Sequence, residues 1–417
     1  MRPPSFKPVQ ASSLLRHKPF VLFLCARIST SLAYQVLGVA VGWQMYELTG
    51  SAWYLGLVGL AQFLPLFLLT LAVGQVADRY DRRMIACLCQ VVQGLAACAL
   101  AVASFGNWQS KESILAIVLA AGAARAFEMP TMQALLPGLV PAPFIPRAVT
   151  GSASALQTAS IVGPALGGLL YAMGTGTVYL TSGVLFCAAS VFIYLIRIQR
   201  AASRREPVTL RSVFAGIDYI RSRPEILGAI SLDLFAVLLG GATALLPIYA
   251  KDILLTGPWG LGLLRSAPAV GALVMSTALI CFPLQRRVGK IMLGAVAIFS
   301  MATIVFALST SFSLSLCALV ILGASDMISV VIRQSLVQIR TPDEMRGRVS
   351  AVNAMFIGTS NQLGEFESGA TAAWFGVVPA VLIGGIGTIL IVLVWMKLFP
   401  QLAHVDSLDT GTAATAP

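Results

Sequence analysis

The sequence predicts an all-α membrane protein with twelve transmembrane helices in two pseudo-symmetric six-helix bundles. Three observations support this fold class: the apolar composition, twelve long apolar segments, and a repeat that relates the two halves of the chain. Hydrophobic residues make up 57% of the 417 residues and charged residues 11%, whereas a soluble domain carries about 25% charged residues. So few charges cannot cover a water-facing surface, and a soluble enzyme is therefore excluded.

Twelve apolar segments are each long enough to cross a bilayer. A hydrocarbon core roughly 30 Å thick needs about 20 apolar residues per helix, so the chain has room for short loops but not for an extramembrane domain. The first segment is too long for the apolar part of a signal peptide, and no small-residue cleavage site follows it. The expected helices occupy residues 20–46, 53–77, 84–105, 113–136, 147–172, 177–196, 226–250, 258–284, 290–309, 313–339, 346–374 and 376–398.

The net charge of +11 reflects membrane topology, so we expect no nucleic-acid partner. Of the 28 Lys and Arg residues, 22 lie in the termini and loops of one side, and only Lys111 and Lys251 lie in the loops of the other. By the positive-inside rule both termini are cytoplasmic. We expect a multi-pass protein of a bacterial inner membrane, in contact with lipid and monomeric.

The chain divides around a basic central segment. We expect a first bundle over 1–196, a cytoplasmic linker over 197–225, a second bundle over 226–400 and a disordered cytoplasmic tail over 401–417. Within the linker, Leu210, Ile217 and Ile220 share one helical face and Arg211 and Asp218 take the other. This pattern predicts an amphipathic helix that lies on the membrane surface.

A shift of 201 residues aligns the fourth and fifth expected helices with the tenth and eleventh without a gap. Parallel repeats of this kind place a transport site at the interface between the halves, near the middle of the membrane. The identical positions in the first repeat are Gly122, Ala123, Gln133, Leu135, Pro141, Arg147, Ala153, Thr158, Gly163 and Gly168.

The segment GQVADRYDRR, residues 74–83, resembles motif A of the major facilitator superfamily, whose pattern is GxxxDRxGRR/K between the second and third helices. Asp81 stands where that pattern has glycine. The resemblance implies that Asp78 lies near the start of the eleventh helix and forms a cytoplasmic latch with the motif's arginines. A plain topological anchor is the alternative. The latch residues would be Gly74, Asp78, Arg79, Arg82 and Arg83.

A second motif, in the fifth expected helix, resembles the GPxxGG core of motif C, which is associated with exporters of the superfamily. Its small residues also fit a simple tight helix crossing. Residues 341–349 resemble a bacterial exporter branch that includes the enterobactin exporter and drug or macrolide efflux proteins. The motif C-like residues are Gly163, Pro164, Gly167 and Gly168.

Ionisable residues at bilayer depth are costly and normally face a partner or a wet cavity. We therefore expect the substrate cavity and the proton-coupling group among them. Arg265 is the exception, since it is expected near the outer end of its helix, where a long side chain can reach the interface. The other candidates are Arg27, Arg125, Glu128, Asp233, Asp326, Arg333, Glu365 and Glu367.

Several pairings among these charges are open. Arg125 and Glu128 share a helix face and could neutralise each other. Because the repeat aligns Arg125 with Asp326, the two could instead pair across the cavity. Arg27 or Arg125 is the expected substrate anchor. The expected coupling carboxylate is Glu128, Asp326, Glu365 or Glu367.

Three further expectations complete the predicted site. Glu365 and Glu367 are two residues apart on a helix, so only one can face the cavity directly. Asp233 and Arg333 could be gate residues nearer the cytoplasm, and interhelical locks are the alternative for every embedded charge. Aromatic and amide side chains that could line the cavity are Tyr34, Gln35, Trp43, Gln44, Gln62 and Gln93.

These features favour a secondary active exporter that works by rocker-switch alternating access. No Walker A sequence occurs, and no cofactor or metal site is expected, so the predicted partners are protons and a small amphipathic substrate such as a siderophore, a drug or a related metabolite. A lysolipid flippase or uniporter on the same fold is the main alternative. A non-transporting membrane sensor or an intramembrane enzyme is a remote one, because no catalytic constellation is present.

Overall fold

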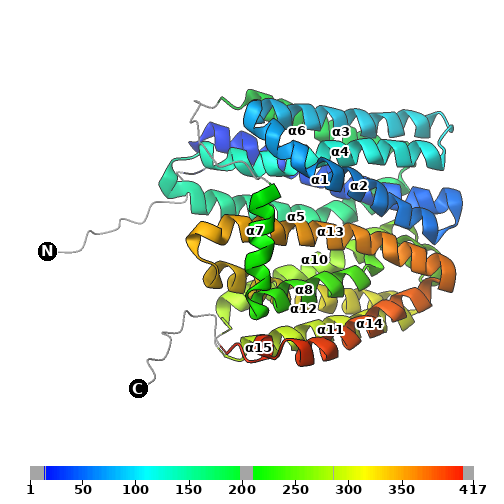
Figure 1. Cartoon of the computed structure of the whole chain (residues 1–417). Helices are drawn as coiled ribbons and strands as arrows, with labels where there is room; N and C mark the ends of the chain where they lie inside the picture. The colour runs from blue at the N-terminus through cyan, green and yellow to red at the C-terminus, as the bar shows by residue number, and fades with distance from the viewer. Residues whose placement is uncertain (1–13, 15, 198–209, 285, 407–417) are drawn as a thin grey trace, which may run out of the picture.

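The computed structural model describes residues 14, 16–197, 210–284 and 286–406, which form helices and, within these ranges, no strand (Figure 1). The first half of the chain contributes α1 (Lys18–Thr49), α2 (Ala52–Arg79), α3 (Arg82–Phe105), α4 (Lys111–Leu135), α5 (Ile145–Ala172) and α6 (Thr175–Leu195). The second half contributes α7 (Leu210–Arg221), α8 (Pro224–Leu239), α9 (Leu246–Ile248), α10 (Gly257–Cys281), α11 (Val288–Leu308), α12 (Phe312–Arg340), α13 (Asp343–Phe375), α14 (Val377–Leu398) and α15 (Pro400–Ala403).

The predicted fold class is confirmed. Within the described residues, eleven spans are long and apolar enough to cross a membrane. The predicted span missing from these eleven is the eleventh, 346–374, which corresponds to α13. This helix has 33 residues and packs against α2, α8 and α14 in the bundle. Its hydropathy is too low because its C-terminal half carries Asn361, Gln362, Glu365 and Glu367. Such residues suit a helix that borders a polar interior.

The seventh predicted helix is interrupted. We expected one helix over 226–250, but α8 ends at Leu239 and the chain continues through the 3₁₀ turn η4 (Ala242–Leu245), α9 and the π-helical turn η5 (Tyr249–Ile253). The reason is the close approach of α13: a Cβ on Gly241 would lie 2.6 Å from the Ser368 hydroxyl oxygen. Because Gly241 has no side chain, α13 can approach the chain here.

The helices form two groups that meet along two seams. Helices α1–α6 pack on one another, as do α8–α14, and the principal contacts between the groups join α2 to α13 and α5 to α10. In Figure 1, α5 of the first group and α13 of the second lie in the middle, where the two groups meet. We call the end of the bundle that holds α7 and the α2–α3 turn the linker end, and the opposite end the far end.

Glycines allow the two helices of each seam to approach closely toward the far end. A Cβ on Gly168 of α5 would lie 3.1 Å from the Trp259 Cα and 3.2 Å from the Gly262 Cα of α10. A Cβ on Gly56 of α2 would lie 3.1 Å from the Gly369 Cα of α13. These glycines lie near the helix ends that meet at the far end, so the two groups touch there backbone to backbone.

Helix α7 packs on the protein. Ile220 is buried with residues of α8, α12 and α13, and a Cβ on Gly216 would lie 3.0 Å from the Arg348 carbonyl oxygen. Phe214 is 61% exposed. The predicted amphipathic helix is therefore present, but its apolar face covers the start of α13 as well as reaching outward. Residues 198–209 of the predicted linker lie outside the described residues.

The chain after α14 is ordered further than we predicted. Leu402 is fully buried, and the Gly289 amide donates to the Val405 carbonyl at 3.0 Å. The Asp406 carboxylate accepts from the Arg287 amide at 3.1 Å. The prediction of disorder from residue 401 is therefore wrong for 401–406, and residues 407–417 lie outside the described residues.

Candidate functional site

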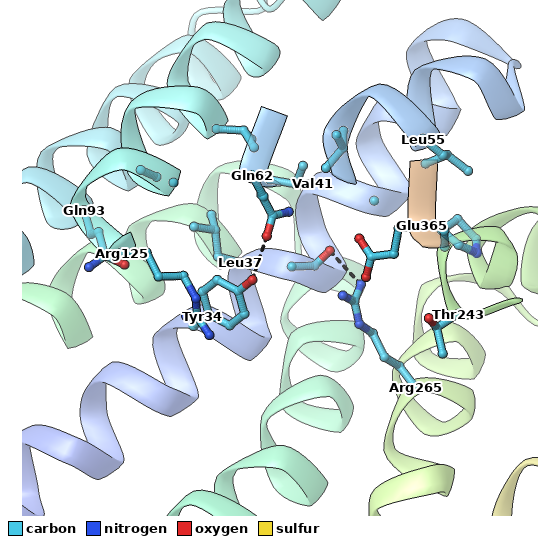
Figure 2. Close-up of a pocket in the computed structure, with 18 residues that line it drawn as sticks. Tyr34, Leu37, Val41, Leu55, Gln62, Gln93, Arg125, Thr243, Arg265 and Glu365 are labelled. Atoms are coloured by element: carbon cyan, nitrogen blue, oxygen red, sulfur yellow. Dashed lines mark hydrogen bonds between the residues drawn. The ribbon is translucent and has the colours of Figure 1, made fainter. Parts of the chain in front are cut away.

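A cavity lies between the two helix groups (Figure 2). It encloses about 830 Å³ of empty space, a figure that includes the open solvent at its mouth. It is lined by Tyr34, Leu37, Gly38, Val41, Gly42, Leu55, Val58, Gln62, Gln93, Val118, Ala121, Gly122, Arg125, Thr243, Ala244, Pro247, Arg265 and Glu365. Both halves of the chain thus contribute to its wall, as the repeat predicted.

The wall from the first half carries a stacked cation. The Arg125 guanidinium carbon lies 3.3 Å from the centroid of the Tyr34 ring, so α4 and α1 meet through a cation–π contact. The Tyr34 hydroxyl donates to the Gln62 amide oxygen of α2 at 2.6 Å. These two contacts fix the orientation of Arg125 at the cavity wall.

The wall from the second half carries a second cation and a carboxylate. Arg265 of α10 donates from Nη1 to the Gly38 carbonyl of α1 at 3.0 Å. Figure 2 shows the Glu365 carboxylate of α13 turned toward the Arg265 guanidinium, which attracts it electrostatically. The prediction that Arg265 reaches outward to the interface is wrong, because Gly38 leaves room for its side chain to turn inward.

Glu365 also lies on the seam between α13 and α2. A Cβ placed on Gly59 would lie 2.8 Å from the Glu365 Cβ and 3.2 Å from its Oε2 atom. Glu365 and Arg265 therefore each contact a glycine of the opposite half, Gly59 and Gly38. Sequence reasoning missed both glycines. Their occurrence on helices that otherwise carry bulky apolar residues is the signal that could have found them.

The first half buries a different ion pair in its interior. Arg27 of α1 and Glu128 of α4 are 8% and 2% exposed, and Arg27 Nη1 lies 3.9 Å from Glu128 Oε1. Neither side chain lines the cavity. Glu128 thus pairs with Arg27, while its neighbour Arg125 turns to Tyr34. Of the two predicted anchors, Arg125 lines the cavity and Arg27 does not, and the anchoring role stays a prediction.

The second half buries its own ion pair. The Arg333 guanidinium of α12 donates directly to the Asp233 carboxylate of α8, and both are buried. Asp326 lies beside this pair, in a narrow gap that is also lined by Asp233 and Ser329. The predicted pairing of Arg125 with Asp326 across the main cavity is therefore absent, because α12 turns Asp326 toward α8 and α11. The Asp233–Arg333 pair is an interhelical lock within one half.

Glu367 has local partners. Its carboxylate accepts a hydrogen bond from the Thr371 hydroxyl at 2.8 Å, one turn further along α13, and another from the Ser368 hydroxyl at 3.5 Å. Glu367 does not line the cavity, whereas Glu365 does. The two glutamates thus diverge as their spacing on the helix requires.

Half of the predicted polar lining is in place. Gln35 instead donates to the Ser160 hydroxyl of α5 at 3.2 Å, Gln44 accepts from the Tyr179 hydroxyl, and Trp43 packs edge-on against Tyr171. The side chains that do line the cavity are Tyr34, Gln62 and Gln93.

The motif C-like residues form two helix contacts. A Cβ on Gly163 would lie 2.5 Å from the Gln35 Cβ, and one on Gly167 would lie 3.1 Å from the Val36 Cα, both on α1. Gly168 faces α10, and Pro164 is buried in the same helix. These residues therefore act in close packing, with α1 on one side and the inter-half seam on the other.

The motif A residues are described only in part. Gly74, Asp78 and Arg79 lie in α2, but the surroundings of the Asp78 and Arg79 side chains are not described, so the predicted latch stays a prediction. Asp81 caps α3 by accepting from the Arg83 amide at 2.9 Å, with Arg82 as the first residue of that helix. Arg83 Nη1 donates to the Ile196 carbonyl at 2.6 Å, which ties α3 to the end of α6.

Sequence relatives share nearly the whole length of the chain. It is 26% identical over 396 residues to the enterobactin exporter EntS of Citrobacter koseri (strain ATCC BAA-895 / CDC 4225-83 / SGSC4696), with 94% of each chain covered. It is 24% identical over 398 residues to the enterobactin exporter EntS of Escherichia coli (strain K12), again with 94% of each covered.

Solved structures show the same fold. A bacterial homologue of the iron transporter ferroportin, in an inward-facing state, superposes with a TM-score of 0.71 at 16% identity, covering 94% of this chain and 99% of that one. A bacterial homologue of the human lysosomal transporter Spinster, inward-facing and occupied, gives 0.70 at 13% identity, covering 95% and 97%. The model of the transmembrane secretion effector family matches residues 10–417. With this match and the membrane-spanning bundle, the chain belongs to that family of major facilitator transporters.

Proposed function

We propose that this transporter is a proton-coupled exporter of a small amphipathic molecule that works by rocker-switch alternating access. The observation that carries the proposal is the position of Glu365, the single carboxylate among the described residues that line the cavity. The linker end, with its basic loops and both chain termini, faces the cytoplasm in this proposal, in a bacterial inner membrane.

The arrangement of the two halves supports alternating access. The cavity wall comes from both halves, and the seams at Gly56–Gly369 and Gly168–Gly262 close the far end beside it. A tilt of one half against the other would open these seams and would also break the side-chain contacts that cross them, such as Trp53 against Phe366. Binding at the interface between repeats then exposes the substrate to each side in turn.

The contacts of Glu365 support its role as the coupling group. It faces Arg265 of α10 and lies against Gly59 of α2, and Arg125 of α4 is the other charge on the cavity wall. Protonation would remove its attraction for Arg265 at the point where α1, α2, α10 and α13 meet. The carboxylates of Glu128 and Asp233 are held by buried arginines, and Glu367 is bonded within its own helix.

Transport by the purified protein in liposomes tests this proposal. Enterobactin is the first substrate to try, because the relatives named above are enterobactin exporters, and macrolides and lysolipids complete the panel. We expect a pH gradient to drive uptake or release by the unmodified protein. Glu365→Gln should abolish gradient-driven flux, whereas Glu367→Gln, the same change two residues away, should retain it.

Two results would contradict the proposal. Gradient-driven flux that persists in Glu365→Gln would remove Glu365 from coupling, and Asp326→Asn and Glu128→Gln would then be the next variants to compare. Transport of a lysolipid that does not respond when the proton gradient is collapsed would instead support the alternative of a flippase or uniporter on the same fold.

A further inference from the structure

We infer that the cavity selects organic anions: molecules with an apolar, preferably aromatic body and an acidic group. This inference rests on the proposed function, since it names the class of substrate that the same cavity takes. The observation behind it is a charge imbalance on the cavity wall. Two arginines, Arg125 and Arg265, face one carboxylate, Glu365, among the described lining residues.

Neither arginine forms a close ion pair within the described residues, but each has a carboxylate that attracts it: Glu365 turns toward Arg265, and Glu128 attracts Arg125 as well as Arg27. The ion pairs among the described residues are Arg27–Glu128, Lys111–Glu112 and Arg333–Asp233, and none involves Arg125 or Arg265. Arg125 is held by the face of an aromatic ring, and Arg265 is held by a backbone carbonyl. Such neutral partners orient a guanidinium without cancelling its charge.

The way each arginine is held leaves hydrogen-bond donors for a ligand. A guanidinium has five N–H donors, all in its plane. Stacking on Tyr34 uses one face of the Arg125 plane and leaves its N–H edge available. Arg265 uses Nη1 on the Gly38 carbonyl, so its remaining donors can serve a carboxylate or another oxyanion, which a guanidinium binds through paired hydrogen bonds.

The rest of the wall suits an apolar body. Leu37, Val41, Leu55, Val58 and Val118 line the same cavity, and Tyr34 adds an aromatic ring. A ligand whose acidic group lies between Arg125 and Arg265 can bury its apolar part against these side chains. A cation of the same shape would lose its hydration beside two arginines, and like-charge placement of this kind discriminates against the wrong ligand.

Equilibrium binding of a matched ligand series tests the inference. The full-length protein in lipid nanodiscs is titrated with naphthalene-2-carboxylate and with naphthalen-2-ylmethylammonium, which share a ring but have opposite charge. Homologues in which one to four methylene groups separate the ring from the charged group extend the series. We expect at least one acid to bind about tenfold more tightly than its matched amine, the effect of about one charge-assisted contact.

Variants then assign the selectivity to the two arginines. Arg125→Gln and Arg265→Gln should each weaken binding of the acid by about tenfold and leave binding of the amine unchanged or tighter. Arg125→Lys keeps the charge but loses the stacked plane, so it should recover only part of the affinity. Arg221→Gln, which removes an exposed charge of α7, should change neither ligand. Thermal unfolding of every variant checks that it is folded.

The inference is overturned if no acid in the series binds more tightly than its matched amine, including the case in which neither binds. It is also overturned if folded Arg125→Gln and Arg265→Gln proteins keep the same preference for the acid. The assay uses no gradient and measures no flux. Loss of proton-coupled transport with charge-selective binding intact would therefore reject the proposed coupling but not this substrate class.

Discussion

Each half of the molecule buries an ion pair between its first and fourth spans, and the signs of the two charges are exchanged between the halves. In the first half, an arginine on α1 faces a glutamate on α4. In the second half, an aspartate on α8 faces an arginine on α12, which are again the first and fourth spans of their bundle. The repeat therefore keeps the pairing of the helices and reverses its polarity. A buried ion pair that joins two helices needs opposite signs, but either helix can supply either sign.

The two pairs also differ in closeness. The Asp233–Arg333 pair is joined by a direct hydrogen bond. The Arg27–Glu128 pair has a separation of 3.9 Å, and the buried Nε atom has no hydrogen-bond partner in either arginine, Arg27 or Arg333. We infer that the Asp233–Arg333 pair contributes more to the stability of the folded protein than the Arg27–Glu128 pair does. The charges that border the cavity, Arg125 and Arg265, are additional to these two pairs.

The largest expected effect comes from breaking the closer pair. Asp233→Asn removes the carboxylate to which Arg333 donates and leaves Asp326 as the remaining carboxylate of this cluster. Breaking a buried ion pair typically costs about 3–5 kcal/mol. Thermal or denaturant unfolding of the purified protein measures this loss. The double variant Asp233→Asn/Arg333→Met removes both charges and should recover most of the stability. An Asp233→Asn protein as stable as the unmodified one would show that the pair contributes nothing.

Breaking the looser pair should cost less. Glu128→Gln removes a carboxylate that lies 3.9 Å from Arg27, and we expect a loss of about 1–3 kcal/mol, the cost of leaving a buried polar group unsatisfied. The same unfolding measurement, run beside Asp233→Asn, decides the comparison. If Glu128→Gln is as destabilising as Asp233→Asn or more so, the difference in closeness between the two pairs has no energetic meaning.

Hydropathy and charge predicted the span count and the fold class because both depend on segment length and composition. The span 346–374 was also predicted from its length and composition, and the repeat separately aligns it with 147–172, the span that became α5. The interruption after Leu239 was missed. It coincides with the approach of α13 to Gly241, and the local signals present there, the Gly240–Gly241 pair and Pro247, were not used as helix breakers.

The site was predicted less completely. The sequence identified which charges are embedded, but not which way each side chain turns. The repeat aligns Arg125 with Asp326, yet Arg125 stacks on Tyr34 and Asp326 turns toward Asp233. Arg265 was assigned to the interface, although the absence of a side chain at Gly38 lets it bind that carbonyl. Side-chain direction thus depends on where a partner helix leaves room.

The smallest change concerns the place where the two halves touch. A Cβ at Gly59 of α2 would lie 2.8 Å from the Glu365 Cβ of α13, so Gly59→Ala forces one helix to move. Alanine favours a helix over glycine by up to about 1 kcal/mol, so the unfolding free energy should change little. Transport should nevertheless fall, because the seam beside the cavity no longer closes.

Gly294→Ala of α11 is the matched control, since nothing lies within 4 Å of a Cβ built at that position. Both variants are compared by unfolding and by flux in liposomes. Equal flux would mean that contact between the halves at Gly59 is dispensable. A loss confined to Gly59→Ala would show that, besides the charges within each half, transport depends on how closely α2 and α13 approach at Glu365. Such a result would show that a substitution can impair the movement between the two bundles without lowering the stability of either.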